Sequence, residues 1–383
     1  MWMRRWLLQG AAALAAGACS AANVPAAEIA KRPFAITEVA TFTSPWAMDF
    51  LPGSGVRMTN AALVSEREGR LWLVDTRSGQ KQAVAGVPQA VVKEQGGLGD
   101  VVADPDFAGN HRIYLTFVEG GKDGTSGAAL GFGSLILGKG QPRLEDFRII
   151  WRQQPKVGGS GHFSHRIAFS PDGQFLFLTS GERQKFDPAQ DLGGNLGKVL
   201  RLTKEGQPAP GNPWASRGGI AREFWSIGHR NLLGIAFAPD GWLWSTEMGP
   251  RGGDELNLIQ SGRNYGWPKA SNGSHYDGRD IPDHQAGDGF EPPKVWWNPS
   301  ISPGGLLIYS GDLFKGWKGD AIVPALSGEA LIRVDIDGDK ARKADHWPMG
   351  ARIRAADQGP DGSIYLLTDE KSGGKLLRLT PKS

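Results

Sequence analysis

The chain has 383 residues, and 43 Lys and Arg against 40 Asp and Glu leave a formal net charge of +3. This balance, without any run of like charges, does not indicate nucleic-acid binding. Glycine (55) and proline (25) make up about a fifth of the chain, against roughly an eighth in typical proteins. Beyond residue 20 the longest stretch free of both is residues 56–68, which excludes helical bundles, coiled coils and Rossmann-type folds. A hydrophobic fraction of 40% with 14 Trp and 16 Phe excludes disorder and favours an all-β fold with many tight turns.

Residues 1–18 are predicted to be an export signal peptide. Arg4 and Arg5 precede an apolar run that is too short for a membrane span. The small residues before Cys19, the only cysteine, resemble a bacterial lipoprotein cleavage site. We expect lipidation of Cys19 and membrane attachment through it; the alternative is an ordinary signal peptide that is cut nearby. Either case predicts an extracytoplasmic protein, periplasmic or anchored at the outer membrane, with the Ala-rich residues 19–33 as a linker.

A turn followed by an apolar strand recurs along the rest of the chain. A Pro-Asp-Gly turn precedes a strand-like run at Pro171, Pro239 and Pro360, and a looser copy lies at Pro105. Proline fixes φ for a turn and Asp-Gly closes it, so each copy predicts a hairpin. These prolines are 66, 68 and 121 residues apart in chain order, and the last interval is about two periods. A further loose copy is Glu68–Gly69.

The repeat predicts the fold of residues 34–383. At that period the 350 residues correspond to between five and six units. We predict one all-β domain, a six-bladed β-propeller of four-stranded antiparallel blades, with five or seven blades as the alternatives. A long β-sandwich would not explain the period. Loops from every blade converge at the central channel of a propeller, so we expect the ligand to bind there.

Two sets of residues could bind or activate a ligand. His162 lies just before a predicted strand, where it is either a general base or a hydrogen-bonded turn residue. Arg352 and Arg354 alternate along a strand and therefore share one face. Such a pair suits a dicarboxylate or a phosphate, and the alternative is a solvated strand edge.

The segment Glu247–Glu255 contains three carboxylates together with glycines and a proline. This composition is typical of a hard-cation site that is built partly from backbone carbonyls. An acidic turn without a ligand is the alternative.

Several short stretches, in this order, resemble a known family. They are Gln95–Leu98, His162–Phe163 followed by Arg166, Ala189–Asp191, Gly197–Arg201, Gly228–Asn231, Gly249–Glu255, Asn264–Pro268 and Arg352–Arg354. From about residue 36 to 380 the chain resembles the soluble quinoprotein aldose dehydrogenases of the glucose/sorbosone dehydrogenase family. Members of this family are six-bladed propellers that hold pyrroloquinoline quinone (PQQ) and calcium.

The resemblance implies a catalytic site with PQQ as cofactor. His162 matches the general base, which takes the proton of the anomeric hydroxyl while hydride passes to the quinone. Arg230 matches the residue that stabilises charge on the quinone oxygen. The implied cofactor-binding residues are Gln95, Arg230, Asn231, Arg352 and Arg354.

The resemblance also implies two calcium ions. Backbone carbonyls of Gly249 and Pro250 match ligands of the catalytic Ca²⁺. Glu255 and Tyr265 match ligands of a second, structural Ca²⁺. Asp277 or Glu291 is expected to complete that second site.

The implied reaction is oxidation of the C1 hydroxyl of an aldose sugar to a lactone, with Ca²⁺ activation of PQQ. An unidentified acceptor, a quinone or a cytochrome, would then reoxidise the cofactor. Two alternatives come from other classes: a metal-dependent lactonase, and a non-catalytic extracytoplasmic binding propeller. The lactonase requires a carboxylate-rich metal site at the centre of the channel and no arginine pair.

Two positions depart from the family pattern. Ser327 stands where the family often has a lysine, so one cationic contact to PQQ would be lost. His165 stands where the family usually has glycine, and it could crowd the pocket, shift the pKa of His162 or act as a second base. Trp296, Trp297 and the nearby residues Pro299 to Gly304 are expected to form a wall against the sugar ring.

Overall fold

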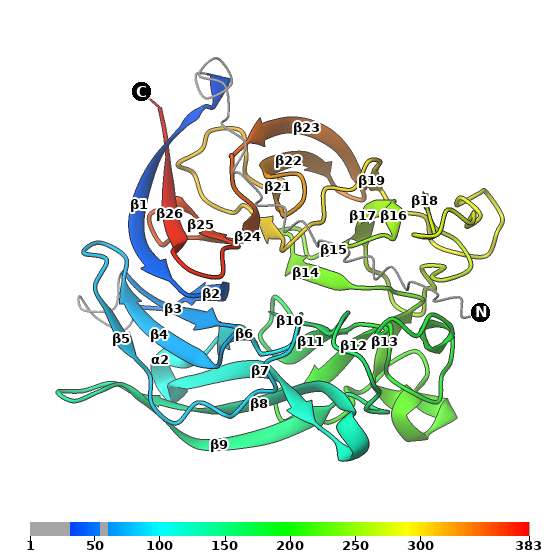
Figure 1. Cartoon of the computed structure of the whole chain (residues 1–383), viewed down its shortest axis with the longest axis horizontal. Coiled ribbons are helices and arrows are strands. Elements are labelled where there is room, and N and C mark those ends of the chain that lie inside the picture. Colours follow the sequence, from blue (N-terminus) through cyan, green and yellow to red (C-terminus); the bar gives the residue numbers. More distant parts are fainter. Residues whose placement is uncertain (1–30, 54–59, 383) are drawn as a thin grey trace, which may run out of the picture.

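The computed structural model describes residues 31–53 and 60–382, which form six four-stranded antiparallel sheets around a central channel. Figure 1 shows the six blades arranged in a ring. The predicted six-bladed β-propeller is therefore confirmed. The predicted signal peptide, Cys19 and the linker up to residue 30 lie outside the described residues. No helix in the described part of the chain is long and apolar enough to cross a membrane.

The four strands of every blade are hydrogen-bonded in order from the channel outwards. Blade 1 contains β2 (Pro45–Phe50), β3 (Ala61–Glu66), β4 (Arg70–Asp75) and β5 (Lys81–Ala83). Blade 2 contains β6 (Leu98–Ala103), β7 (Arg112–Gly120), β8 (Ser126–Ile136) and β9 (Arg143–Arg152). Blade 3 contains β10 (Ser164–Phe169), β11 (Phe175–Ser180), β12 (Lys198–Thr203) and β13 (Phe224–Ile227).

The remaining blades follow the same order. Blade 4 contains β14 (Leu232–Phe237), β15 (Leu243–Glu247), β17 (Asp254–Leu258) and β19 (Val295–Trp297). Blade 5 contains β20 (Leu307–Ile308), β21 (Ala321–Ala325), β22 (Ala330–Asp337) and β23 (Lys340–Pro348). Blade 6 contains β24 (Ile353–Gln358), β25 (Ile364–Thr368), β26 (Gly374–Pro381) and β1 (Phe34–Phe42).

Only short elements lie outside the blades in the described residues. A two-stranded sheet joins β16 (Arg251–Gly252) to β18 (Gly273–Ser274). The helices are α2 (Phe107–Asn110), η1 (Lys122–Gly124), η2 (Asp187–Ala189), η3 (Ala215–Arg217) and η4 (Gly219–Glu223). The scarcity of helix agrees with the high glycine and proline content.

The two ends of the chain close the ring in blade 6. The first strand, β1, pairs antiparallel with the last, β26, from Phe34 opposite Pro381 to Phe42 opposite Gly374. In Figure 1 the blue β1 lies beside the red β26. The contact begins before the predicted domain boundary at residue 34, because the carbonyl of Pro33 accepts a hydrogen bond from the Lys382 N–H at 2.9 Å.

The proline turns predicted from the sequence join the first strand of a blade to the second. In blades 3, 4 and 6 the glycine N–H of the turn donates to the carbonyl three residues earlier, at 2.8 to 2.9 Å. The copy at Pro105 lies in the corresponding connection of blade 2, which also contains α2. Glu68–Gly69 differs, because it joins the second and third strands of blade 1 and is not a copy of this turn.

The apolar core lies between neighbouring blades. One buried cluster combines Trp244 and Leu256 of blade 4 with Val323 and Ile332 of blade 5. Each blade therefore buries its faces against its neighbours rather than within itself, as expected for a repeat architecture.

Phe34→Ala is expected to lower the free energy of unfolding by about 3 kcal/mol or more, because a buried ring and its contacts are lost. Phe34 is 1% exposed, and its ring packs edge-on against Trp347 at a centroid distance of 5.3 Å. Urea denaturation measures the change. Ile36→Ala in the same strand is the control, because Ile36 is 36% exposed. Equal losses in the two variants would contradict this account of the closure.

Candidate functional site

A cavity of about 460 Å³ opens at the end of the channel where the inner strands begin. Its wall contains residues that lie just before those strands or at their first positions, such as Trp46, Ser164 and Asn231. Four residues predicted to bind the cofactor line this cavity. They are Gln95, Asn231, Arg352 and Arg354. The fold therefore brings these four together from segments far apart in the sequence.

His162 and Arg230 lie beside the cavity, each next to a residue of its wall. The backbone N–H of His162 donates to the side-chain oxygen of Gln95 at 2.9 Å. Arg230 directly precedes Asn231, a residue of the cavity wall.

The two predicted anion-binding arginines share one carboxylate, Asp369. The Arg352 Nε donates to Asp369 at 3.0 Å, and the Arg354 Nε and Nη2 donate to its other oxygen at 2.9 and 2.7 Å. Asp369 follows β25, the strand that pairs with β24, and this pairing explains why it meets both arginines. Arg67 and Lys371 also line the cavity, so its wall carries four cationic side chains against two carboxylates, Asp369 and Glu370. Such a wall suits an anionic ligand.

His162 is paired with a carboxylate that the sequence analysis missed, Glu182. The His162 Nδ1 lies 2.5 Å from Glu182 Oε1, and both side chains are buried. Burial lowers the pKa of His162; the hydrogen bond to Glu182 opposes this change, and the charge of Arg230 reinforces it. The imidazole is therefore neutral at pH 7. With its proton on Nδ1 towards Glu182, the ring presents the Nε2 lone pair as a base.

Glu182 is itself fixed by the backbone of its own loop. Its carboxylate accepts the N–H groups of Gln184, Lys185 and Phe186 at 2.9, 2.5 and 2.6 Å. Burial raises the pKa of Glu182, but the hydrogen bonds from His162 and from the backbone outweigh this and lower it overall. Glu182 therefore remains an anion that orients His162.

The two loops that carry this pair adopt strained backbone conformations. Six non-glycine residues have positive φ of 50–63°: His162, Ser164, His165, Arg183, Gln184 and Phe186. The buried guanidinium of Arg183 holds both loops together. It donates to the carbonyls of Gly161, Ser126 and Gly159 at 2.9, 2.6 and 2.6 Å, and it lies over the Phe163 ring. Clusters of such conformations are characteristic of functional sites.

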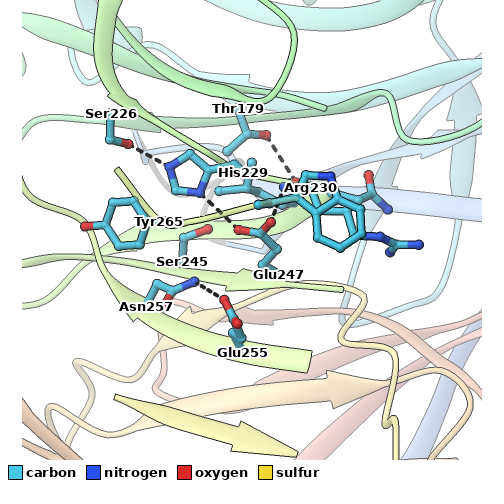
Figure 2. Close-up of polar contacts among 12 residues, drawn as sticks. Thr179, Ser226, His229, Arg230, Ser245, Glu247, Glu255, Asn257 and Tyr265 are labelled. Atoms are coloured by element: carbon cyan, nitrogen blue, oxygen red, sulfur yellow. Dashed lines mark hydrogen bonds and ion pairs between the residues drawn. The ribbon is translucent and has the colours of Figure 1, made fainter. Parts of the chain in front are cut away.

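A buried polar network positions Arg230, as Figure 2 shows. Glu247 accepts the backbone N–H of Arg230 with one oxygen and contacts His229 Nδ1 at 3.0 Å with the other. His229 Nε2 in turn lies 2.8 Å from the Ser226 hydroxyl. The Arg230 guanidinium donates to the carbonyls of Met248 and Gly249 at 3.0 and 2.6 Å.

The segment predicted to bind a cation is organised around two of its own carboxylates. Glu247 holds Arg230, and Asp254 accepts the N–H groups of Gly249, Ile301 and Ser302 at 2.8, 2.7 and 2.6 Å. Glu255 is the third carboxylate of the segment, and Asn257 donates to it at 3.0 Å. Two of the three therefore shape the loop, as in the alternative of an acidic turn.

The surroundings of Glu255 and Gly249 nevertheless fit a cation. Burial, together with Glu247 and Asp254, raises the pKa of Glu255 to about 8. Within the described residues Asn257 Oδ1 is buried without a hydrogen-bond partner. The Gly249 carbonyl already points at a positive group, the Arg230 guanidinium. In the described ranges, however, three His, Cys, Asp or Glu side chains do not converge on one metal position, so backbone oxygens would be needed.

The other residues implied as calcium ligands have separate surroundings. Pro250 is buried beside Gly249. The Tyr265 hydroxyl donates to the Leu258 carbonyl at 2.5 Å, and its ring stacks on His229. Asp277 is exposed and forms an ion pair with Arg279, whose Nε lies 2.8 Å from the Asp277 carboxylate. Burial raises the pKa of the Tyr265 phenol, and the charge of the nearby Glu291 adds to this rise.

The two departures from the family pattern both lie at the cavity. His165 lines it, stacks on Trp46 and contacts the Thr116 hydroxyl at 2.8 Å. Burial lowers the pKa of His165 to about 3, which makes it a poor general base at neutral pH. Ser327 lies 2.8 Å from the hydroxyl of Ser302, a residue of the wall.

The two tryptophans of the expected wall do not reach the cavity, whereas Ser302 of the same expected wall lines it. Trp296 and Trp297 lie on β19, the outermost strand of blade 4, and neither lines the cavity. Trp297 is part of the core between blades 4 and 5. A short run of aromatic residues in the sequence does not distinguish the outer strand of a blade from the wall of a ligand-binding site.

The channel contains a second group of carboxylates farther along its axis. Asp49, Asp100 and Asp357 line a cavity of about 170 Å³ between the inner strands. Arg166 occupies this region and donates to Asp100 at 3.0 Å. Burial raises the pKa of Asp49 to about 7. Within the described residues, three His, Cys, Asp or Glu side chains do not converge on one metal position here.

Comparison with known proteins identifies the family. The model of the family described as glucose/sorbosone dehydrogenase matches residues 42–378. The chain belongs to this family. The aldose sugar dehydrogenase YliI of Escherichia coli (strain K12) is 39% identical over 346 residues, which cover 88% of this chain and 90% of that protein.

Solved structures agree with this glucose/sorbosone dehydrogenase assignment. The apo-form crystal structure of the soluble aldose sugar dehydrogenase from Escherichia coli matches with a TM-score of 0.84 at 38% identity. That match covers 91% of this chain and 100% of the other. The PQQ-bound form of an aldose sugar dehydrogenase from Streptomyces coelicolor matches with a TM-score of 0.73 at 27% identity, and covers 91% and 98% of the two chains.

The two neighbouring histidines are expected to titrate differently. In an NMR titration of the imidazole signals, His162 should titrate below its ordinary pKa of 6.5, and His165 should stay neutral down to about pH 3. In Glu182→Gln the His162 pKa should fall further, because the carboxylate favours the protonated ring. A His162 pKa above 6.5, or an unchanged value in Glu182→Gln, would contradict the described pairing.

Proposed function

We propose that the chain oxidises the anomeric C1 hydroxyl of aldose sugars to lactones, with PQQ as the oxidant and Ca²⁺ as its activator. The coarser statement, that it is an aldose sugar dehydrogenase of the PQQ-dependent kind, follows from the family and from its relatives. The observation that carries the finer proposal is the buried His162–Glu182 pair beside a cavity with a cationic wall.

The cavity suits PQQ in charge and in hydrogen-bonding groups. PQQ is a flat tricarboxylate, and Arg352 and Arg354 are held side by side in the wall by Asp369. Gln95 and Asn231 offer amide groups in the same wall. These four residues would hold the cofactor. When bound, PQQ supplies the two-electron oxidant, and a Ca²⁺ ion beside it makes its quinone more electrophilic.

His162 would act on the hydroxyl of the sugar. Its neutral Nε2 takes the proton of the C1 hydroxyl, and the imidazolium so formed is stabilised by Glu182 across the 2.5 Å contact. Arg230, fixed by Glu247, places a permanent positive charge nearby and stabilises negative charge on a reacting oxygen. Because burial lowers the pKa of His162 below its ordinary value, the base is unprotonated at neutral pH.

The residues that would hold Ca²⁺ are those implied by the resemblance. The carbonyls of Gly249 and Pro250 would bind the ion that serves the cofactor, and Glu255 and Tyr265 would serve the structural one. The raised pKa of Glu255 supports this assignment, because a nearby cation would relieve its unfavourable burial.

The setting of the reaction follows from the predicted export signal. We place the enzyme outside the cytoplasm, in the periplasm or attached to the outer membrane through a lipidated Cys19. A quinone or a cytochrome would take the electrons there.

His162→Ala is expected to abolish sugar oxidation while PQQ still binds, because the side chain acts on the substrate rather than on the cofactor. Loss of a general base costs on the order of 10²- to 10⁴-fold in rate. Dye reduction measures turnover, and the absorbance of PQQ measures binding. Full activity in this variant would overturn the assigned base and point to His165.

Arg354→Met is expected to weaken PQQ binding by about tenfold or more, because a charge-assisted contact to a carboxylate is lost. Absorbance titration with PQQ measures the affinity. Arg378→Met is the matched control, since Arg378 pairs with Asp361 away from the cavity. Equal affinity in Arg354→Met and the unaltered protein would remove the arginine pair from the cofactor site.

A further inference from the structure

Three aromatic side chains gather beside the candidate base, and two of them, Phe186 and Tyr276, expose their rings, whereas Trp267 is buried. Phe186 stacks on Trp267 at a centroid distance of 5.7 Å, and Tyr276 lies on the neighbouring surface loop. Phe186 is 43% exposed and Tyr276 is 75% exposed, although both carry large aromatic rings. We call Phe186, Trp267 and Tyr276 the aromatic platform.

The aromatic platform is joined directly to the residues of the proposed reaction. The backbone N–H of Phe186 donates to Glu182, the carboxylate that orients His162. The Arg230 guanidinium lies over Trp267 at 5.1 Å and over Tyr276 at 5.9 Å. Its Nη2 also lies 3.4 Å from the Tyr276 hydroxyl. A substrate held at His162 and Arg230 therefore has this platform at its side.

The fold does not explain why the rings of Phe186 and Tyr276 are exposed. Phe186 serves Glu182 through its backbone N–H, which a residue of any type except proline would provide. Tyr276 contacts Arg230 through its hydroxyl and the face of its ring, yet three quarters of the residue remain in solvent. Aromatic rings bordered by polar groups suit the faces of sugars, which carry C–H groups on one side and hydroxyls at the edge.

We propose that the aromatic platform binds the second ring of a reducing disaccharide whose C1 end lies at His162. The inference rests on the proposed function, because it takes the reacting end of the sugar to be at that histidine. The aromatic platform would then set how well the enzyme uses sugars longer than one ring. A flat electron acceptor is the competing occupant, and the experiment separates the two.

The test uses the PQQ- and Ca²⁺-loaded protein with glucose and maltose. In Phe186→Ala and in Tyr276→Ala, the ratio of kcat/KM for maltose to that for glucose should fall about tenfold, mainly through KM for maltose. Tyr276→Phe keeps the ring and should retain most of the ratio. Trp242→Ala is the control, because Trp242 is also exposed, at 39%, but follows the turn at the opposite end of blade 4.

Binding is measured separately in the protein without cofactor. Saturation-transfer NMR should show contact with the non-reducing ring of maltose, and this signal should fall in Phe186→Ala. An unchanged substrate ratio together with an unchanged transfer signal would overturn the proposal. A change in KM for the dye alone would also overturn it, in favour of an acceptor site. Absence of oxidation of either sugar would instead reject the proposed function, while the transfer signal would still decide the role of the platform.

Discussion

The pairing of β1 with β26 closes the propeller, and the candidate site depends on that closure. Asp369 and the two arginines belong to blade 6, whereas Ser44 and Trp46 of the same cavity belong to the first segment of the chain. The Ser44 N–H donates to the Glu370 carbonyl at 3.1 Å, directly after β1 ends. The cationic wall is therefore assembled only when the last strand of the chain has found the first. Because this contact joins the two ends of the described chain, the cationic wall is complete only when the whole ring of blades is closed.

The loops around the candidate base, His162, combine backbone strain with contacts that offset part of its cost. The loops around His162 and Glu182 hold several non-glycine residues at positive φ, each at a cost of about 1 kcal/mol or more. Arg183 offsets part of this cost by donating to three backbone carbonyls from a fully buried position. Its pKa falls to about 10 through burial, so the guanidinium remains charged at neutral pH. The strain sets the imidazole between Glu182 and the cavity, where a relaxed loop would not.

The sequence was most informative where a residue type determines the local backbone conformation by itself. Proline turns recur at the same connection of several blades, and their spacing predicted the six blades, because turn chemistry is local. Arg352 and Arg354 were predicted to share a face, and both contact Asp369. The turn at Glu68–Gly69 shows the limit, since a similar motif serves a different connection of the blade.

Partners across strands could not be read from the sequence. Glu182 and Asp369 follow the second strands of their blades, and they meet His162 and the arginines only through strand pairing. Gly181 and Glu182 lie just after the end of a predicted strand, and this position was the available signal. It identifies His162 as the partner only when the pairing register of that strand with its neighbour is known. The role of Glu247 was hidden in the same way, because its partners His229 and Arg230 lie just before the neighbouring strand.

The most direct test of the account is reconstitution of the protein lacking its first 18 residues. Reduction of an artificial dye would be followed with glucose in four mixtures: without additions, with PQQ, with Ca²⁺, and with both. The account predicts sugar-dependent reduction only when both are present. Absence of PQQ binding, followed by the absorbance of PQQ in the two mixtures that contain it, would contradict this prediction.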